Sequence, residues 1–334
     1  MATIYQVAEL AGVSLSTVSR VINGRKTVNP ELREKVEQAM RKLNYRPNSV
    51  ARSLASSRSD SVGLLISELD TPFFGEMMQA VEATLRAANK HVIITVGHNN
   101  PEQELDGLEF LISRNCDALI MHVEALSDDQ LRQINQDRIP IALVNRVVEG
   151  LESHCITLDN EMGGYLATRH LIDLGHTQIA CIAGPGNKQD AVKRLEGHKR
   201  ALKEVGLPFK ASLVYEGDYT EVEGVNGFKW LSRKTANFTA LVCANDWMAS
   251  GAISAAREAG LSLPEDLSII GFDNVLFAHH LFPKLTTIKN PIYQMGEMAA
   301  SAVLQRVYRQ KVVVQNTFIP ELVERDSAIP WVQK

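Results

Sequence analysis

The chain has 334 residues, of which 45% are hydrophobic and 22% are charged, and its formal net charge is -4. This composition is that of a folded globular protein and excludes a disordered chain, and the length suits a small domain followed by a two-lobed one. No apolar run is long enough to span a bilayer, and the opening residues show no export signal, so we expect a cytoplasmic protein without a membrane partner.

Basic charge is concentrated near the N-terminus. Residues 1–60 hold 10 Lys and Arg against 5 Asp and Glu, whereas the rest of the chain holds 25 against 34. A basic segment suits the phosphates of a nucleic acid, although a charge bias on its own often only keeps a surface solvated. The four cysteines show no metal-ligand spacing, so we expect reduced thiols, no metal and no cofactor.

The first predicted elements are two short helices joined by a tight turn. The apolar residues of the first helix recur at helical spacing: Ile4, Val7, Ala8 and Ala11. Gly12 ends this helix, because glycine adopts the positive φ of a tight turn, and Ser14 is a suitable N-cap for the next helix. The pattern therefore predicts a helix-turn-helix unit.

The second helix turns Val18, Val21 and Ile22 back toward the core. Its other faces carry side chains suited to the major groove of DNA: Leu15, Ser16, Thr17, Ser19, Arg20 and Asn23. Arg20 can bond a guanine in bidentate fashion, Ser16 can pair with several bases, and Leu15 can pack on a thymine methyl. By pattern alone, a helical hairpin whose polar face only contacts water fits equally well.

A third helix is expected after Asn29, its N-cap, with Pro30 in its first turn. Its buried stripe is Leu32, Val36, Ala39, Met40 and Leu43. Pro47 then breaks the chain, and an Ala- and Ser-rich linker follows at 49–57. One helical face of this linker is apolar, but a free helix of this length is marginal in water, so it would fold only against a partner.

From residue 62 onward, short apolar runs alternate with helical patterns. The runs are 62–66, 92–96, 118–121, 141–144, 179–183, 240–243 and 268–272. Strands of this kind with helices between them predict parallel sheets built from βαβ units, and so an α/β fold.

Polar and aromatic side chains follow several of these runs. They are Asp70, Phe73, Phe74, Asn145, Arg146, Asn245, Asp246 and Asp273. In an open α/β sheet the ligand lies beyond the carboxyl ends of the strands, so we expect these residues at a site for a small polar molecule. Each has an ordinary alternative: the phenylalanines can belong to the core, Asp246 can cap a helix, and Arg146 can be a solvated charge.

An enzyme with this fold is the first alternative function. The sequence contains no glycine-rich phosphate-binding motif, no G-x-S-x-G elbow and no histidine cluster with metal-ligand spacing, so we expect no enzymatic activity. A binding or transport protein is the second alternative. The basic helical segment and the missing export signal disfavour it.

The N-terminal part resembles the head of the lactose/galactose repressor family of transcription regulators in four strings: Val7-Ala8, Ala11-Gly12-Val13-Ser14, Thr17-Val18-Ser19-Arg20-Val21-Ile22-Asn23 and Tyr45-Arg46-Pro47-Asn48. The body resembles the same family in further strings: Pro72-Phe73-Phe74, 245–249, 264–274 and 285–288. The resemblance therefore covers nearly the whole chain.

The resemblance implies three segments. These are a helix-turn-helix DNA-binding domain at 1–46, a hinge helix at 47–60, and a periplasmic-binding-protein-like body of two α/β lobes with parallel sheets at 61–334. Lobe 1 is expected at about 61–159 and 292–322, and lobe 2 at about 160–291.

The family also implies a homodimer that binds near-palindromic operator DNA as a repressor. The paired hinge helices would enter the minor groove and wedge Leu54 into a base step. Further expected DNA contacts are Thr3, Asn48, Ala51 and Arg52.

A small sugar effector held between the lobes is a further implication of the resemblance. It adds Arg194, Tyr219 and Asn290 to the expected site, where a guanidinium, amides, carboxylates and aromatic rings suit a sugar. The chain is similar to the galactose repressor branch, so galactose is the first candidate. It departs from that branch at 184–187, at 277–282 and at Leu15-Ser16. These departures leave open another hexose or a glucoside as the effector, and the identity of the operator. The sequence also leaves open a regulator that depends on a corepressor or that responds to another small metabolite.

Overall fold

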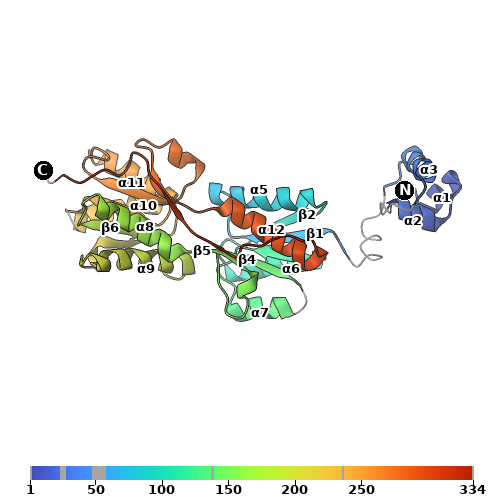
Figure 1. The fold of residues 1–334 in the computed structure, drawn as a ribbon, viewed down its shortest axis with the longest axis horizontal. Coiled ribbons are helices and arrows are strands. Elements are labelled where there is room, and N and C mark those ends of the chain that lie inside the picture. Colours follow the sequence, from blue (N-terminus) through green and yellow to red (C-terminus); the bar gives the residue numbers. More distant parts are fainter. Residues whose placement is uncertain (1, 23–27, 47–57, 137–138, 235–236, 333–334) are drawn as a thin grey trace. The chain divides into compact units, whose positions relative to one another are not determined.

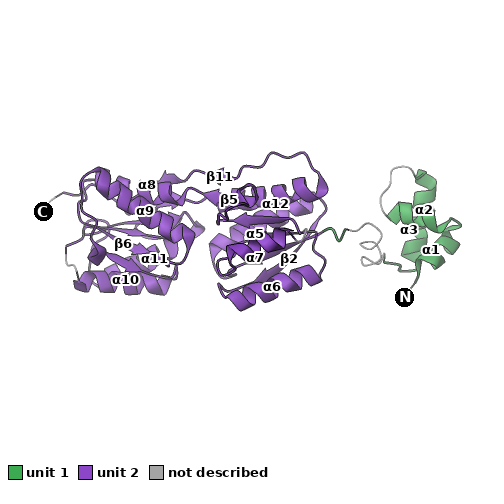
Figure 2. Ribbon diagram, turned by 90° about the horizontal axis from the view of Figure 1, so that it is seen from below, with its two compact units in different colours: residues 1–60 green, residues 61–334 purple. Residues whose placement is uncertain are grey.

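The computed structural model describes residues 2–22, 28–46, 58–136, 139–234 and 237–332. The chain divides into two units, 1–60 and 61–334, each with its own hydrophobic core (Figures 1 and 2). Most of the expected hinge helix lies outside the described residues, and so do five of the candidate DNA contacts: Asn23, Asn48, Ala51, Arg52 and Leu54.

The described residues of the first unit form three short helices: α1 (Ile4–Ala11), α2 (Leu15–Ile22) and α3 (Pro30–Lys42). Gly12 ends α1 in the left-handed region at φ 65°. At the start of α2 the Ser14 hydroxyl accepts a hydrogen bond from the Thr17 amide at 3.2 Å. The tight turn predicted from these residues is therefore present. The small core buries Val7, Ala8, Val18, Val21, Val36 and Ala39.

Leu32 does not belong to this core as expected, because its side chain is 36% exposed. It lies in the first turn of α3, which has 13 residues, whereas α1 and α2 have eight each. Two helices of that length cannot cover all of α3, so its N-terminal turn stays in contact with water.

Lobe 1 of the second unit contains a six-stranded sheet of order β11-β5-β4-β3-β1-β2, in which neighbouring strands are parallel. Its strands are β1 (Ser61–Ile66), β2 (His91–Val96), β3 (Ala118–Met121), β4 (Ile141–Val144), β5 (Cys155–Leu158) and β11 (Thr317–Phe318). Its helices are α5 (Pro72–Ala87), α6 (Pro101–Ser113), α7 (Asp128–Gln136), the short η1 (Glu152–His154) and α12 (Ile292–Tyr308). The late helix α12 returns to pack against α5.

Lobe 2 contains a second six-stranded sheet, of order β12-β10-β9-β8-β6-β7. Its strands are β6 (Ile179–Ala183), β7 (Val214–Glu216), β8 (Ala240–Cys243), β9 (Ser268–Asp273), β10 (Thr286–Lys289) and β12 (Glu321–Val323). Its helices are α8 (Asn160–Asp173), α9 (Gln189–Glu204), η2 (Ala211–Leu213), α10 (Glu221–Lys234), α11 (Asp246–Glu258) and η3 (Leu276–His279). The edge strand β12 is antiparallel to β10, so the segment expected in lobe 1 at 292–322 already enters the lobe 2 sheet at Glu321.

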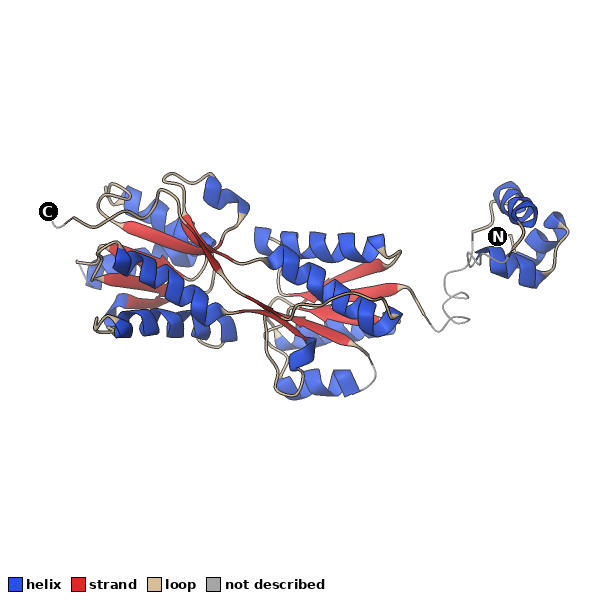
Figure 3. Cartoon of the chain, in the orientation of Figure 1, coloured by secondary structure: helices blue, strands red, loops and turns tan. Residues whose placement is uncertain are grey.

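Helices cover both faces of each sheet (Figure 3). The inner strands β3, β4, β6 and β8 are buried at every residue, as expected for parallel strands between two helical layers. The chain passes between the lobes after β5, after β10 and after β11. Within the described ranges, every helix is too short or too polar to cross a membrane.

Candidate functional site

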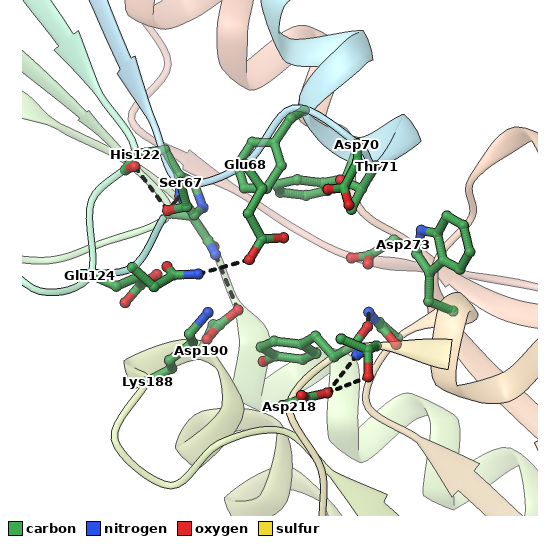
Figure 4. A pocket seen from close by; sticks show the side chains of 18 of the residues that line it. Ser67, Glu68, Asp70, Thr71, His122, Glu124, Lys188, Asp190, Asp218 and Asp273 are labelled. Carbon is green, nitrogen blue, oxygen red and sulfur yellow. Dashed lines mark hydrogen bonds between the residues drawn. The ribbon is translucent and has the colours of Figure 1, made fainter. Parts of the chain in front are cut away.

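A cavity of about 210 Å³ lies in the second unit, at the carboxyl ends of strands from both sheets (Figure 4). One water molecule needs only roughly 10–15 Å³, so this cavity has room for a small molecule. It collects eight of the expected effector residues: Asp70, Phe73, Phe74, Asn145, Arg194, Tyr219, Asn245 and Asp273. Because these residues come from both lobes, a ligand here would contact both.

Arg194 on α9 is the centre of a polar network in the cavity wall. Its Nε donates to Asn160 Oδ1 at 2.9 Å, and its Nη1 donates to the Ala244 carbonyl at 2.6 Å. Its Nη2 lies 3.5 Å from a carboxylate oxygen of Asp190 and 3.7 Å from one of Asp273. The side chain is only 6% exposed, so these partners hold the guanidinium in one orientation.

Direct polar contacts join the two lobes beside the cavity. Asn145, which follows β4 in lobe 1, donates from Nδ2 to Asp190 on α9 in lobe 2 at 3.2 Å. Gln189 accepts from the Val147 amide and donates to the Val147 carbonyl, both at 3.2 Å. Since Asp190 also pairs with Arg194, a ligand that contacts Arg194 acts on the same network that joins the lobes.

Four cavity residues have backbones in the left-handed region: Asn99 at φ 52°, Asn145 at 61°, Tyr219 at 78° and Asp273 at 105°. Such conformations cost about 1–3 kcal/mol each in residues other than glycine and persist where surrounding contacts hold them, often at ligand sites. Asn245 holds one of them, because its Nδ2 donates to the Tyr219 carbonyl at 2.9 Å. Its Oδ1 accepts from the Met248 amide at 2.9 Å and so caps α11.

Arg146 is one of three expected effector residues that lie outside the cavity lining. Its guanidinium does not line the cavity. It forms an ion pair with Asp128 at 2.7 Å and donates to the Val123 carbonyl at 3.2 Å. These contacts tie the loop after β4 to the loop after β3. Arg146 therefore has a structural role in place of the expected ligand contact.

Asp246 and Asn290 also lie outside the lining. Asp246 is 1% exposed and accepts from the Thr287 hydroxyl at 2.6 Å and the Val275 amide at 2.9 Å, so it links the start of α11 to β10 and to the loop after β9. Asn290 donates to Asp273 at 3.1 Å and orients that carboxylate. Both therefore act through neighbouring residues.

The cavity contains further residues that the sequence analysis did not select. Four follow predicted strands, so the expectation that ligand residues lie just after strand ends could have found them: Ser67, Glu68, His122 and Glu124. Asp218 follows β7, which the sequence did not predict. Asp190 lies one helical turn before Arg194, a spacing that could have indicated an ion pair. Trp247 carried no signal, because its place beside Asn245 in the helix start does not reveal which way the indole points.

Burial shifts the pKa of several cavity groups. It raises the pKa of Glu124 to about 7, with repulsion from Asp190 adding to the rise. It also raises the pKa of Asp273 to about 6, against the opposing effect of Arg194. Burial lowers the pKa of His122 to about 4, so this imidazole is neutral at pH 7. The neutral ring is within 3.2 Å of the Ser67 hydroxyl through Nδ1.

A second buried histidine, outside the cavity, makes stability depend on pH. The Thr168 hydroxyl donates to the Gly164 carbonyl at 2.9 Å, so His198 Nδ1 donates to Thr168 at 2.9 Å. Burial, with a smaller contribution from Lys199, lowers the pKa of His198 to about 4 from its ordinary 6.5. Between pH 6.5 and about 4, His198 therefore binds a proton in the unfolded chain but not in the folded chain. The free energy of unfolding falls as the pH falls through this range.

His198→Asn should remove this dependence. We expect the wild type to lose about 2–3 kcal/mol more of its unfolding free energy than the variant between pH 7.5 and 4.5. The comparison isolates the contribution of His198. The raised pKa values of Glu124 and Asp273 have the opposite effect on the pH dependence of the unfolding free energy, and this effect is the same in both proteins. Urea denaturation at the two pH values measures it, and equal pH slopes would show that His198 does not contribute.

Helices α8 and α9 pack closely against each other, and this packing sets the position of Arg194. Two glycines make the close approach of the helices possible. A Cβ at Gly197 would overlap the Glu161 carbonyl oxygen, and one at Gly164 would overlap the Arg194 carbonyl oxygen. We expect Gly197→Ala to push α9 outward and to lower the unfolding free energy by about 1–3 kcal/mol. Thermal denaturation measures this, with the exposed neighbour Glu196→Ala as a control expected to stay within about 0.5 kcal/mol. An unchanged Tm in Gly197→Ala would contradict tight packing here.

The first unit presents the outer side of α2 as a candidate nucleic-acid interface. Leu15 is 38% exposed, and Ser16, Ser19 and Arg20 are also exposed. Thr17 is half-buried, and its hydroxyl lies 2.9 Å from that of Ser14. The described part of this unit therefore offers a basic and hydroxyl-bearing helix surface.

Thr3 has a local structural role at the start of the first unit. Its side chain and that of Gln6 form a capping box at the N-terminus of α1. The Thr3 hydroxyl is therefore engaged with the helix that it precedes.

Comparison with known proteins gives matches over both units. Residues 3–48 match the lacI family of bacterial regulatory proteins, and residues 168–328 match a periplasmic binding protein-like domain. The transcriptional regulator GalR of Escherichia coli is 39% identical over 328 residues, which are 98% of this chain and 96% of GalR. The transcriptional repressor PurR of Actinobacillus pleuropneumoniae is 38% identical over 98% of both chains.

Solved structures agree with these matches. The lac repressor dimer bound to operator and the anti-inducer ONPF is 30% identical to this chain, with a TM-score of 0.87. The match covers 98% of this chain and 99% of the lac repressor chain. This protein belongs to the lacI family of bacterial regulatory proteins. It is a transcription regulator with a helix-turn-helix DNA-binding domain and a two-lobed α/β body, and the enzyme alternative is set aside because its relatives are regulators.

Proposed function

We propose that this chain is a cytoplasmic, homodimeric repressor of a sugar-utilisation operon. Its helix-turn-helix domain and hinge bind a near-palindromic operator, and a small sugar in the cavity releases it. The observation that carries the proposal is the network of Arg194, Asp190 and Asn145, which links the cavity wall to the contact between the lobes. A ligand that binds one arrangement of the lobes better than the other shifts the population between them.

The DNA-binding part of the proposal rests on α2. Its exposed Leu15, Ser16 and Arg20 would read bases in the major groove, while Thr17 and Ser19 complete the surface. Thr3 would contact DNA at the start of α1, and Asn23, Asn48, Ala51, Arg52 and Leu54 are proposed contacts from the remaining head and the hinge. The likeness to the lac repressor dimer bound to operator supports binding as a symmetric pair.

The effector part rests on the chemistry of the cavity. Carboxylates and the Arg194 guanidinium can pair with sugar hydroxyls, and Phe73 and Tyr219 offer flat apolar surfaces to a ring. Galactose is the first candidate because the chain is 39% identical to GalR over almost its whole length. We expect the sugar to contact lining residues from both lobes: Arg194, Asp190 and Asp273, with Asp70, Phe73, Phe74, Asn145, Tyr219 and Asn245.

A gel-shift titration tests the proposal. The full chain is titrated onto palindromic DNA from upstream of sugar-utilisation genes, at fixed low salt, with and without galactose, glucose and glycosides of both. We expect specific binding that one sugar weakens by at least about 10-fold, with DNA weakening sugar binding by the same factor. A sugar that strengthens binding would make the chain corepressor-dependent, and no preference for any palindrome would overturn the proposal.

A further inference from the structure

The cavity lining carries far more acid than base. Seven carboxylates line it, against only two basic side chains, Lys188 and Arg194, a formal excess of five negative charges. Glu68, Glu124, Asp190 and Asp273 are among the carboxylates, and Figure 4 shows them around the open space. Even with Glu124 protonated, four negative charges remain in excess.

The positive charge of Arg194 is already balanced by the protein. Its Nη2 lies 3.5 Å from Asp190 and 3.7 Å from Asp273, and its Nε and Nη1 donate to Asn160 and to a carbonyl. A phosphate or carboxylate on a ligand would therefore have to compete with two fixed carboxylates for this guanidinium. The cost of that competition is high, because a charge held in a buried site is poorly screened.

Lys188, the second basic side chain, lies among the carboxylates of the lining, so an anion placed near it would also be repelled by them. Its ammonium lies 5.4 Å from the centroid of the Tyr219 ring, and its field lowers the pKa of Glu124. It thus offsets the repulsion between the carboxylates of Glu124 and Asp190. His122 adds no charge, because burial keeps its imidazole neutral.

The hydrogen-bonding groups of the lining also select against anions. Carboxylate oxygens only accept hydrogen bonds, so they need a ligand that donates. Asn99 donates to Glu68 at 2.9 Å, and its buried Oδ1 has no hydrogen-bond partner among the described residues. Trp247 Nε1 is likewise buried at the cavity without a partner, and it donates. Hydroxyl groups can donate and accept, and ammonium groups can donate, whereas phosphate and carboxylate groups only accept.

We infer that this cavity takes saccharides that bear no negative charge, either uncharged sugars or their amino derivatives, and rejects phosphorylated and carboxylated sugars. The inference rests on the proposed function, because it names the ligand class of the same site. It does not depend on which hexose the site prefers. The aromatic rings of Phe73, Tyr219 and Trp247 are compatible with an uncharged ring or with a cation.

Matched sugars that differ only in charge test this inference. The full chain is titrated by calorimetry with galactose, galactosamine, galacturonate and galactose 6-phosphate, and with the four corresponding glucose compounds. We expect the uncharged or amino member of one series to bind at least about 100-fold more tightly than both anionic members. An anionic member that binds as tightly as its uncharged parent would overturn this inference and leave the proposed function intact. No binding in either series would overturn both.

A variant identifies the cause of the discrimination. At pH 8.5, above the pKa of about 7 of Glu124, Glu124→Gln removes one cavity charge with little change in shape, and we expect the preference for the uncharged sugar over its 6-phosphate to fall by about 5–10-fold. Glu109→Gln on α6 removes the same charge from an exposed position outside the lining and should leave the preference unchanged. An unchanged preference in Glu124→Gln would assign the discrimination to shape and contradict the electrostatic explanation.

Discussion

Arg194→Ala should give a protein that no longer responds to its effector and that is less stable by about 3–5 kcal/mol. The stability loss follows because Asp190 and Asp273 would stay buried without their cation, and a buried ion pair broken on one side costs that much. The loss of response follows because the same guanidinium lines the cavity. Urea denaturation measures the first effect, and effector titration of the operator complex measures the second.

Two further variants make this result interpretable. Arg194→Lys keeps the positive charge but loses the planar guanidinium that donates to Asn160 and Ala244 at the same time. We therefore expect a smaller loss of stability than in Arg194→Ala, and a weaker response to the effector than in the wild type. Arg200→Ala, on the same helix, removes a partly exposed pair with Glu161 and should cost less than about 1 kcal/mol. An Arg194→Ala protein with normal sugar affinity would remove this residue from the proposed site.

Glu104→Gln should destabilise lobe 1 by about 3 kcal/mol, although it changes only one atom. Glu104 is fully buried, and its two carboxylate oxygens accept from the amides of Glu124, Ala125 and Leu126 at 2.8–3.0 Å. A glutamine offers a single acceptor, and its amide nitrogen would face at least one of these buried N–H donors. Hydrogen bonds to a charged group contribute about 1.5–3 kcal/mol each, and an unsatisfied buried donor adds its desolvation cost.

The same change should also reach the cavity. The loop that Glu104 holds carries Glu124 into the cavity lining, so effector affinity should fall together with stability. Asp106→Asn, an exposed residue of the same helix, is the matched control and should change the unfolding free energy by less than about 0.5 kcal/mol. Urea denaturation and calorimetric titration measure the two effects, and a Glu104→Gln protein as stable as the control would show that the loop does not need this carboxylate.

Local patterns in the sequence were sufficient for seven of the twelve strands in the described residues and for the class of fold. All seven predicted apolar runs are strands. Six of them are buried at nearly every residue, and a strand buried on both faces must be apolar at almost every residue. The run 92–96 is the partly exposed edge strand β2. The turn at Gly12 and the cap at Asn29 follow from backbone and side-chain properties of single residues. Five strands were not predicted. The strands β7, β11 and β12 have only two or three residues, which carry no readable pattern, and β5 and β10 mix threonine, cysteine or lysine with their apolar residues.

Tertiary structure alone decided which side chains meet. The expectation that ligand residues follow the carboxyl ends of strands correctly selected Asn145, Asn245 and Asp273. It could not show that Arg146 pairs with Asp128 or that Asp246 bonds to Thr287. Nor could it pair Asn145 with Asp190, which is 45 residues further along the chain. Spacing along one chain determines the face of a helix or strand on which a residue lies. The partner of that residue depends on how separate elements pack, and this is set by the cores of both lobes together.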